Sequence, residues 1–98
     1  EEGLHASLAE TSLMLALKPE LVGDERPNEC INGPIPEGWS LEGNAPTAWL
    51  TEDLSKSGVI GDSRGANASL GKNLKELLIN HWFKLIMNLM QSDWPNNS

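Results

Sequence analysis

Residues 23–65 constrain the possible folds of this chain more than any other stretch. They are rich in Gly, Pro, Asn and carboxylates, and the prolines within residues 23–48 leave no run long enough for a helix. Helix-like patterns lie on both sides of this loop region. A structureless segment of such length is uncommon in a compact domain that folds alone. We therefore expect another chain to supply part of the fold.

Residues 66–91 carry the clearest helical pattern. Apolar residues recur there at spacings of three and four, and Lys, Glu and Asn occupy the opposite side. Further apolar residues make the stripe wider than on an ordinary surface helix. We expect this helix to contact a sheet on one side and another element or subunit on the other. The main stripe consists of Leu70, Leu74, Leu77, Leu78, Trp82, Leu85, Ile86 and Leu89.

A shorter helix is predicted within residues 1–22, beginning after Ser7. Ser7 and Glu10 match the capping-box pattern, in which a hydroxyl and a carboxylate three residues later each accept from a backbone amide. The helix is apolar on most sides and ends at Lys18, because the residue before a proline avoids the α region. His5 precedes the cap, where the positive end of the helix dipole favours the neutral imidazole that a general base requires. The local pattern leaves open whether His5 is a working base or only a turn residue.

The loop region ends in a second distinctive segment, SGVIGD, residues 57–62. Ser57-Gly58 and Gly61-Asp62 bracket Val59-Ile60, which predicts a tight loop around a two-residue apolar plug. Glycines at this spacing allow the loop to present N–H groups to a ligand, or they only punctuate a turn. The spacing alone favours the turn.

Charge and cysteine content exclude several classes of protein. The net charge is −7, and a chain without a basic stripe is a poor candidate for binding nucleic acid or an anionic membrane. No apolar run approaches the roughly 20 residues of a membrane span, and the first residues show no secretory signal. Cys30 is the only cysteine, so no internal disulfide is possible. We therefore expect a cytoplasmic protein.

Two segments resemble the creatininase (creatinine amidohydrolase) family. Residues 5–12, HASLAETS, are similar to the His-(Ala/Gly)-Gly-x-x-Glu-Thr-Ser segment of that family, which leads into a helix ending in Pro-(Glu/Asp)-Leu-Val. Residues 19–22, PELV, match that ending. The stretch from Trp49 to Asp62 resembles the segment that many members carry before their last helix. The two matches occur in the same order, so the resemblance extends over nearly the whole chain.

The resemblance implies an α/β fold, with three α/β/α layers around a mainly parallel sheet. This chain would be the C-terminal part of that single domain and would itself be mostly helix plus long loops. It would consist of the histidine-motif helix (1–22), the loop region (23–65) and the closing helix (66–91). Members commonly form hexamers. We therefore expect a homo- or hetero-oligomer in which the N-terminal part of the enzyme is a separate chain.

The resemblance also implies a metal-dependent amidohydrolase that opens a cyclic amide or a related C–N bond with metal-activated water. His5 would shuttle a proton to the departing nitrogen, and Glu10 would hold the histidine segment at the edge of the site. Ser57 and Gly58 would belong to a substrate-side loop. The divalent ions, of Zn or Mn type, are bound in the family by residues upstream of the motif. No metal ligand is therefore expected in residues 1–98, and the chain alone should be inactive.

The sequence departs from the family pattern in three places. Ser7 stands where the family usually has glycine, and Leu4 stands where creatininase has a glutamate before the histidine. Residues 63–70, SRGANASL, lack the proline and the Glu-Lys pair of the family phrase Asp-Pro-x-x-Ala-Thr-Ala-Glu-Lys-Gly. These departures support an alternative from another class, a non-catalytic structural or interaction subunit or an inactive homologue.

Overall fold

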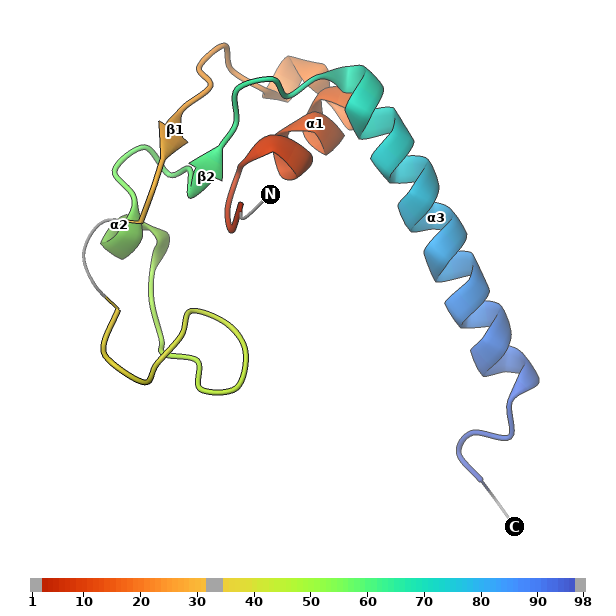
Figure 1. The fold of residues 1–98 in the computed structure, drawn as a ribbon. Coiled ribbons are helices and arrows are strands. Elements are labelled where there is room, and N and C mark those ends of the chain that lie inside the picture. The colour runs from red at the N-terminus through yellow and green to blue at the C-terminus, as the bar shows by residue number, and fades with distance from the viewer. Residues whose placement is uncertain (1–2, 32–34, 97–98) are drawn as a thin grey trace.

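A computed structural model describes residues 3–31 and 35–96, which leaves residues 32–34 of the loop region outside the description. Figure 1 shows α1 lying across the start of α3, while the rest of α3 extends away from the short strands and the loops. In chain order the elements are α1 (Leu8–Leu17), the 3₁₀ turn η1 (Pro19–Leu21), β1 (Asn28–Glu29), α2 (Thr51–Leu54), β2 (Gly61–Asp62) and α3 (Ala68–Gln91).

The boundaries of the two longer helices agree closely with the sequence pattern. Ser7 is the N-cap residue of α1, and the helix ends before Lys18-Pro19 as predicted. The closing helix starts at Ala68 rather than at residue 66, because Asn67 is its N-cap. The Asn67 side chain accepts a hydrogen bond from the Leu70 amide at 2.8 Å, which satisfies one of the amides left unpaired at a helix start.

The crossing of α1 over α3 depends on a serine and a glycine. Ser12 is fully buried, with 0% of its surface exposed, and its hydroxyl accepts a hydrogen bond from the Asn67 amide at 3.1 Å. Gly71, which is also buried, faces Ser12 from α3. A Cβ atom at Gly71 would overlap the Ser12 carbonyl and come within 3.0 Å of the Ala16 methyl group. The helices therefore approach so closely that position 71 has room only for glycine.

Three segments that are distant in sequence pair around Ile60. β1 and β2 are antiparallel, with Asn28 opposite Asp62 and Glu29 opposite Gly61. On the other side, Ile60 forms an antiparallel bridge with His5. Val59 and Ile60 are buried, which confirms the predicted apolar plug. The strands were not predicted, because two-residue strands contain too few positions to show an alternating pattern.

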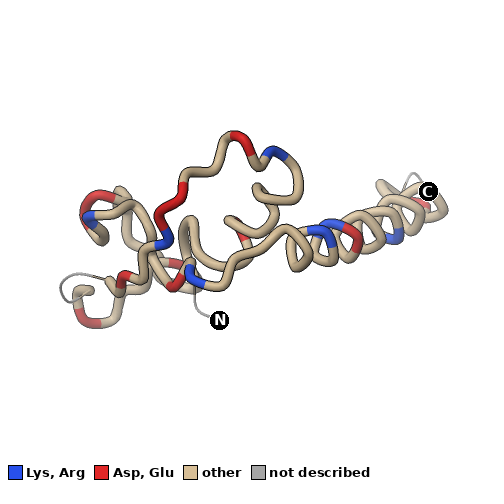
Figure 2. The backbone as a smooth tube through the Cα atoms, turned by 90° about the horizontal axis from the view of Figure 1, so that it is seen from above, with Lys and Arg blue, Asp and Glu red and all other residues tan. Residues whose placement is uncertain are grey.

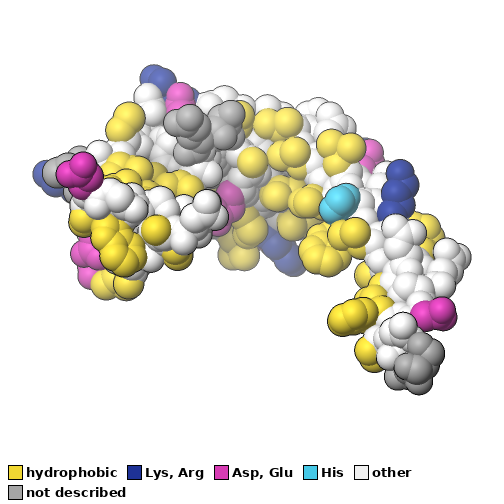
Figure 3. All heavy atoms as spheres, turned by 60° about the horizontal axis from the view of Figure 1, so that its bottom comes forward, with side chains coloured by type: hydrophobic (Ala, Val, Ile, Leu, Met, Phe, Trp, Pro, Cys, Tyr) yellow, Lys and Arg dark blue, Asp and Glu magenta, His cyan; other side chains and the backbone are white. Residues whose placement is uncertain are grey.

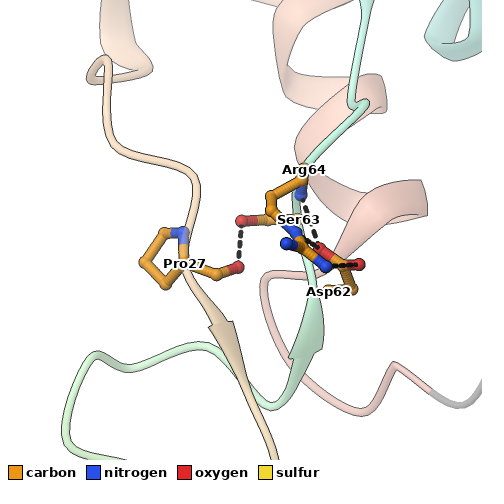
Figure 4. Close-up of polar contacts among 4 residues, drawn as sticks. All are labelled: Pro27, Asp62, Ser63 and Arg64. Carbon is orange, nitrogen blue, oxygen red and sulfur yellow. Dashed lines mark hydrogen bonds and ion pairs between the residues drawn. The ribbon is translucent and has the colours of Figure 1, made fainter.

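Figure 4 shows how the pairing continues beyond β2. The backbone amide and the hydroxyl of Ser63 both donate to the Pro27 carbonyl, at 3.0 and 2.6 Å. Next to it, the Arg64 guanidinium donates to both carboxylate oxygens of Asp62, at 2.9 and 3.0 Å. These hydrogen bonds from Arg64 lower the pKa of Asp62 and raise that of Arg64. The loop ahead of β1 is thereby joined to the segment that leads into α3.

Most apolar side chains of α3 lie on the surface. Trp82 and Phe83 are 59% and 64% exposed, and Figure 3 shows the apolar side chains gathered along one side of this helix. The radius of gyration is 17.7 Å, compared with about 13 Å for a compact domain of roughly 100 residues. The wide apolar stripe is thus present, and α1 packs against α3 near the start of that helix (Figure 1).

The charged residues are distributed unevenly along the chain. Figure 2 shows acidic residues concentrated in the loop region and basic residues along α3. No helix among the described residues is both long enough and apolar enough to cross a membrane.

Replacing Gly71 by Ala should separate the two helices. Overpacking costs about 1–3 kcal/mol, and overlap with a backbone carbonyl places Gly71→Ala at the upper end of that range, above the roughly 1 kcal/mol that alanine gains over glycine in a helix. We expect Gly71→Ala to lower the midpoint of thermal unfolding followed by circular dichroism. Gly23→Ala is the control, because a Cβ atom there meets nothing within 4 Å. An unchanged midpoint for Gly71→Ala would contradict the close crossing.

Candidate active site around His5

His5 is exposed at the surface, yet its backbone and its ring are both held by the loop of residues 55–60, here called loop 55–60. The Ile60 amide donates to the His5 carbonyl at 2.9 Å. The ring Nδ1 lies 2.6 Å from the carbonyl oxygen of Gly58. A carbonyl oxygen can only accept, so Nδ1 carries the proton in this contact. In the neutral ring Nε2 is then the unprotonated nitrogen, which is the form that accepts a proton from a reacting group.

The turn before α1 holds the peptide group that follows His5. Ala6 has a φ of +50°, a left-handed conformation that is uncommon for a residue other than glycine. Its amide donates to the Glu10 carboxylate at 2.7 Å, and its carbonyl accepts from the Thr11 hydroxyl at 2.9 Å. Both polar groups of Ala6 are therefore bound by side chains from the first turn of α1.

This arrangement corrects the predicted capping box. The Ser7 hydroxyl does not cap α1, and Glu10 accepts from the amide of Ala6 rather than from that of Ser7. The physical reason is the left-handed turn at Ala6, which directs the amide of that residue towards the first helical turn. Glu10 thus contacts the residue next to His5, and it does not touch the imidazole itself.

Glu29 holds the other end of loop 55–60. Its carboxylate accepts from the Lys56 amide at 2.6 Å and from the Ser57 amide at 3.1 Å. The neighbouring Ser55 hydroxyl and, after it, these two amides lower the pKa of Glu29 below its ordinary value of 4.5. Nothing in the sequence around Glu29 singles it out as a site residue. A lone acid in a loop carries no local signal, because the amides it binds are 27 and 28 residues away.

The remaining amides of loop 55–60 are also used within the chain. Gly58 has a φ of +87°, which glycine adopts without strain. Each N–H group of residues 56–60 already has an acceptor, so the loop does not offer them to a ligand and the turn interpretation of its glycines is supported. The group that the loop presents to His5 is a carbonyl. Beyond the two amides held by Glu29, the bonds are Gly58 N–H to Ser55 Oγ (3.1 Å), Val59 N–H to Ser57 Oγ (3.2 Å) and Ile60 N–H to the His5 carbonyl (2.9 Å).

The four residues selected from the sequence are only partly brought together. Gly58 contacts the His5 ring directly, whereas Glu10 reaches only the neighbouring Ala6. Ser57 caps the loop through its hydroxyl and does not bond to His5. A hollow of about 480 Å³ beside β1 and β2 is lined by Gly3, Glu29, Ile60 and their neighbours. None of the four selected residues lines it.

The side chains that could bind a metal ion are dispersed among the described residues. Within the part of the chain that the structure describes, no three His, Cys, Asp or Glu side chains lie close enough together to hold a metal ion. These side chains therefore do not form a complete metal centre by themselves.

Comparison with known protein families shows the family to which the chain belongs. The family model described as creatininase, creatinine amidohydrolase, matches residues 1–86. The chain belongs to the creatininase family. A search of curated proteins and a search of solved structures each return no match. Membership implies a creatininase-like α/β fold and hydrolase activity, and members of the family generally use divalent metal ions.

Family membership gives the geometry around His5 its context. The segment that carries the family-like motif, residues 5–12, is the one in which backbone and side-chain contacts converge from loop 55–60 and from α1. The second family-like segment, which includes SGVIGD, supplies the carbonyl that binds the imidazole. The two family-like segments, which are separate in sequence, are therefore in contact at the imidazole ring of His5.

Removing the Glu10 carboxylate should weaken the start of α1. Glu10 binds the amide of the residue before the N-cap, and its loss should cost about as much as the loss of an N-cap side chain, about 1 kcal/mol within a range of roughly 0.5–2 kcal/mol. We expect Glu10→Ala to lower the free energy of unfolding by that amount in chemical denaturation. Glu25→Ala, an exposed acid in the loop region, should change it little. Equal losses in the two variants would argue against the hydrogen bond from Ala6 to Glu10.

Acid should release loop 55–60 from Glu29. Because the pKa of Glu29 is lower in the folded chain than its ordinary 4.5, its stabilising contribution is complete above that value. It is lost as the pH falls through the lower, folded-state pKa. The amide chemical shifts of Lys56 and Ser57 should change together over that range in nuclear magnetic resonance (NMR) titrations. Asp62→Asn should retain the transition and Glu29→Gln should lack it; constant shifts in the unmodified chain would contradict the contact.

Proposed function

We propose that this chain supplies the proton-transferring histidine of a metal-dependent amidohydrolase that cleaves a cyclic amide or a related C–N bond. The observation that supports the proposal most directly is the 2.6 Å contact between His5 Nδ1 and the Gly58 carbonyl. It leaves Nε2 of the neutral ring able to accept a proton. Family membership supplies the class of reaction.

In the proposed role, His5 acts in two steps. Nε2 first accepts a proton from the attacking water, and the resulting imidazolium keeps its Nδ1–H on the Gly58 carbonyl. Nε2 then returns the proton to the departing nitrogen as the C–N bond breaks. A positioned acid–base group of this kind contributes about 10²–10⁴-fold to the rate.

The remaining residues have supporting roles in this proposal. Glu10 binds the Ala6 amide and so fixes the backbone next to the histidine. Ser57 and Gly58 belong to the loop that faces the substrate. Ligands for the divalent ions, of Zn or Mn type, would lie outside these 98 residues. The partner would be the N-terminal part of the enzyme, present as a separate chain within a homo- or hetero-oligomer, and the assembly would be cytoplasmic.

A second candidate is a non-catalytic structural or interaction subunit. The exposed apolar side chains of α3, such as Trp82 and Phe83, favour it, since side chains of this size are usually covered in a finished assembly. This candidate predicts that His5 is dispensable, which the following experiment tests.

Replacing His5 should remove amide hydrolysis from the assembled enzyme. We expect His5→Ala, co-expressed with the segment that carries the metal ligands, to lose about 10²–10⁴-fold in kcat. The loss should appear in an assay of ring opening with creatinine or another cyclic amide. His81→Ala is the matched control, because His81 is exposed on α3, which is a different element from the His5 segment. Full activity of His5→Ala would exclude the proposed role and favour the structural subunit.

A further inference from the structure

The useful orientation of His5 depends on a single side-chain contact. The ring is exposed, and an exposed imidazole can rotate and exchange between its two neutral forms. Which nitrogen carries the proton is set by the hydrogen bond that the ring makes. Here that bond runs from Nδ1 to the Gly58 carbonyl, at 2.6 Å. The position of the Gly58 carbonyl therefore determines which nitrogen can accept a proton.

Gly58 lies in a loop that is held from two sides. On one side Ser55, which is buried, accepts from the Gly58 amide at 3.1 Å and donates to the Val59 carbonyl at 2.7 Å. On the other side the Glu29 carboxylate binds the amides of the two residues that precede Gly58. Glu29 is itself fixed by the backbone, because it pairs with Gly61 in the sheet of β1 and β2.

We propose that Glu29 is a positioning residue for His5. Its carboxylate holds residues 56 and 57 so that the next carbonyl, that of Gly58, accepts the Nδ1 proton and leaves Nε2 unprotonated. The importance of this contact for catalysis rests on the function proposed above. The protonation pattern of the ring is a property of the chain itself and can be measured without substrate, metal or partner.

A charged carboxylate suits this task better than an amide side chain. Two backbone N–H groups converge on it, and hydrogen bonds to a charged acceptor are shorter and stronger than those between neutral groups. A glutamine in the same place has one acceptor oxygen, and its NH₂ group would face the second amide. Glu29→Gln therefore preserves the shape of the side chain and disrupts the two-point contact.

The experiment uses nitrogen–proton correlation NMR of the imidazole rings in the full 98-residue chain, at a pH that keeps them neutral. In the unmodified chain we expect His5 to carry its proton on Nδ1. In Glu29→Gln the population with the proton on Nε2 should rise. Hydrogen exchange of the Lys56 and Ser57 amides should also become about tenfold faster or more.

Two controls separate this effect from general damage to the chain. Glu25→Gln replaces an exposed acid and should leave His5 unchanged. His81, on α3, is an internal reference whose signals should be the same in every variant. The helical circular dichroism signal should also persist, since α1 and α3 do not depend on the Glu29 contact. If Glu29→Gln loses that signal, Glu29→Asp replaces it, because it keeps the charge but shortens the reach, and it should shift part of the His5 population.

Three results would overturn the proposal. The first is a proton on Nε2 of His5 in the unmodified chain. The second is faster exchange of the loop amides in Glu29→Gln while His5 stays protonated on Nδ1. The third is an unchanged hydrogen-exchange rate of the Lys56 and Ser57 amides in Glu29→Gln. Where Glu29→Asp is used in place of Glu29→Gln, an unchanged His5 is the equivalent of the second result. Failure of the activity test with His5→Ala would leave these measurements intact, so the two proposals can fail separately.

Discussion

The antiparallel pairing of Ile60 with the backbone of His5 is the interaction on which the rest of the structure depends. Ile60 is 2% exposed, and its carbonyl accepts from the amides of Leu4 and His5 at 2.9 and 3.3 Å. The two residues after Ile60 pair with β1. One short buried segment therefore joins the histidine segment, the loop region and the approach to α3.

The sequence predicted those features whose cause lies in neighbouring residues. The end of helix α1 follows from Lys18-Pro19, and the buried Val59-Ile60 pair follows from its flanking glycines. The partners of these elements were beyond prediction. Asn28–Glu29 pairs with residues more than thirty positions later, and nothing in the local pattern of either strand specifies the other. The crossing at Ser12 and Gly71 is similar, because a small residue on an apolar helix indicates close packing only once its partner is known.

At the candidate site the same distinction applies. The family-like motif identified His5 and Glu10, but local rules gave Glu10 the wrong amide, since they assume ordinary backbone geometry before a helix. The left-handed Ala6 breaks that assumption. The role of Glu29 could not be found from the sequence, because it depends on hydrogen bonds from two amides of a loop that is distant in sequence.

The serine that departs from the family glycine has a structural explanation. Ser7 has a φ of −90°, which any residue adopts. Its side chain is buried against Gly61, where an added Cβ atom would lie 2.8 Å from the Ser7 Cβ. Gly61 has a φ of +131°, so a side chain there would be strained as well as crowded. The absence of a side chain at position 61 therefore leaves room for the buried Ser7 side chain.

The length of α3 has a thermodynamic consequence. A helix of 24 residues spans about 36 Å, and the α1 contacts at Ser12 and Gly71 support only its first turns. The later turns are apolar and exposed among the described residues, so their order depends on the intrinsic helix propensity and on any molecule that covers them. A covering molecule that binds only the folded chain would stabilise it by mass action. The measured stability of this protein should therefore vary with the concentration of whatever occupies α3, so that it describes an assembly equilibrium as much as a single chain.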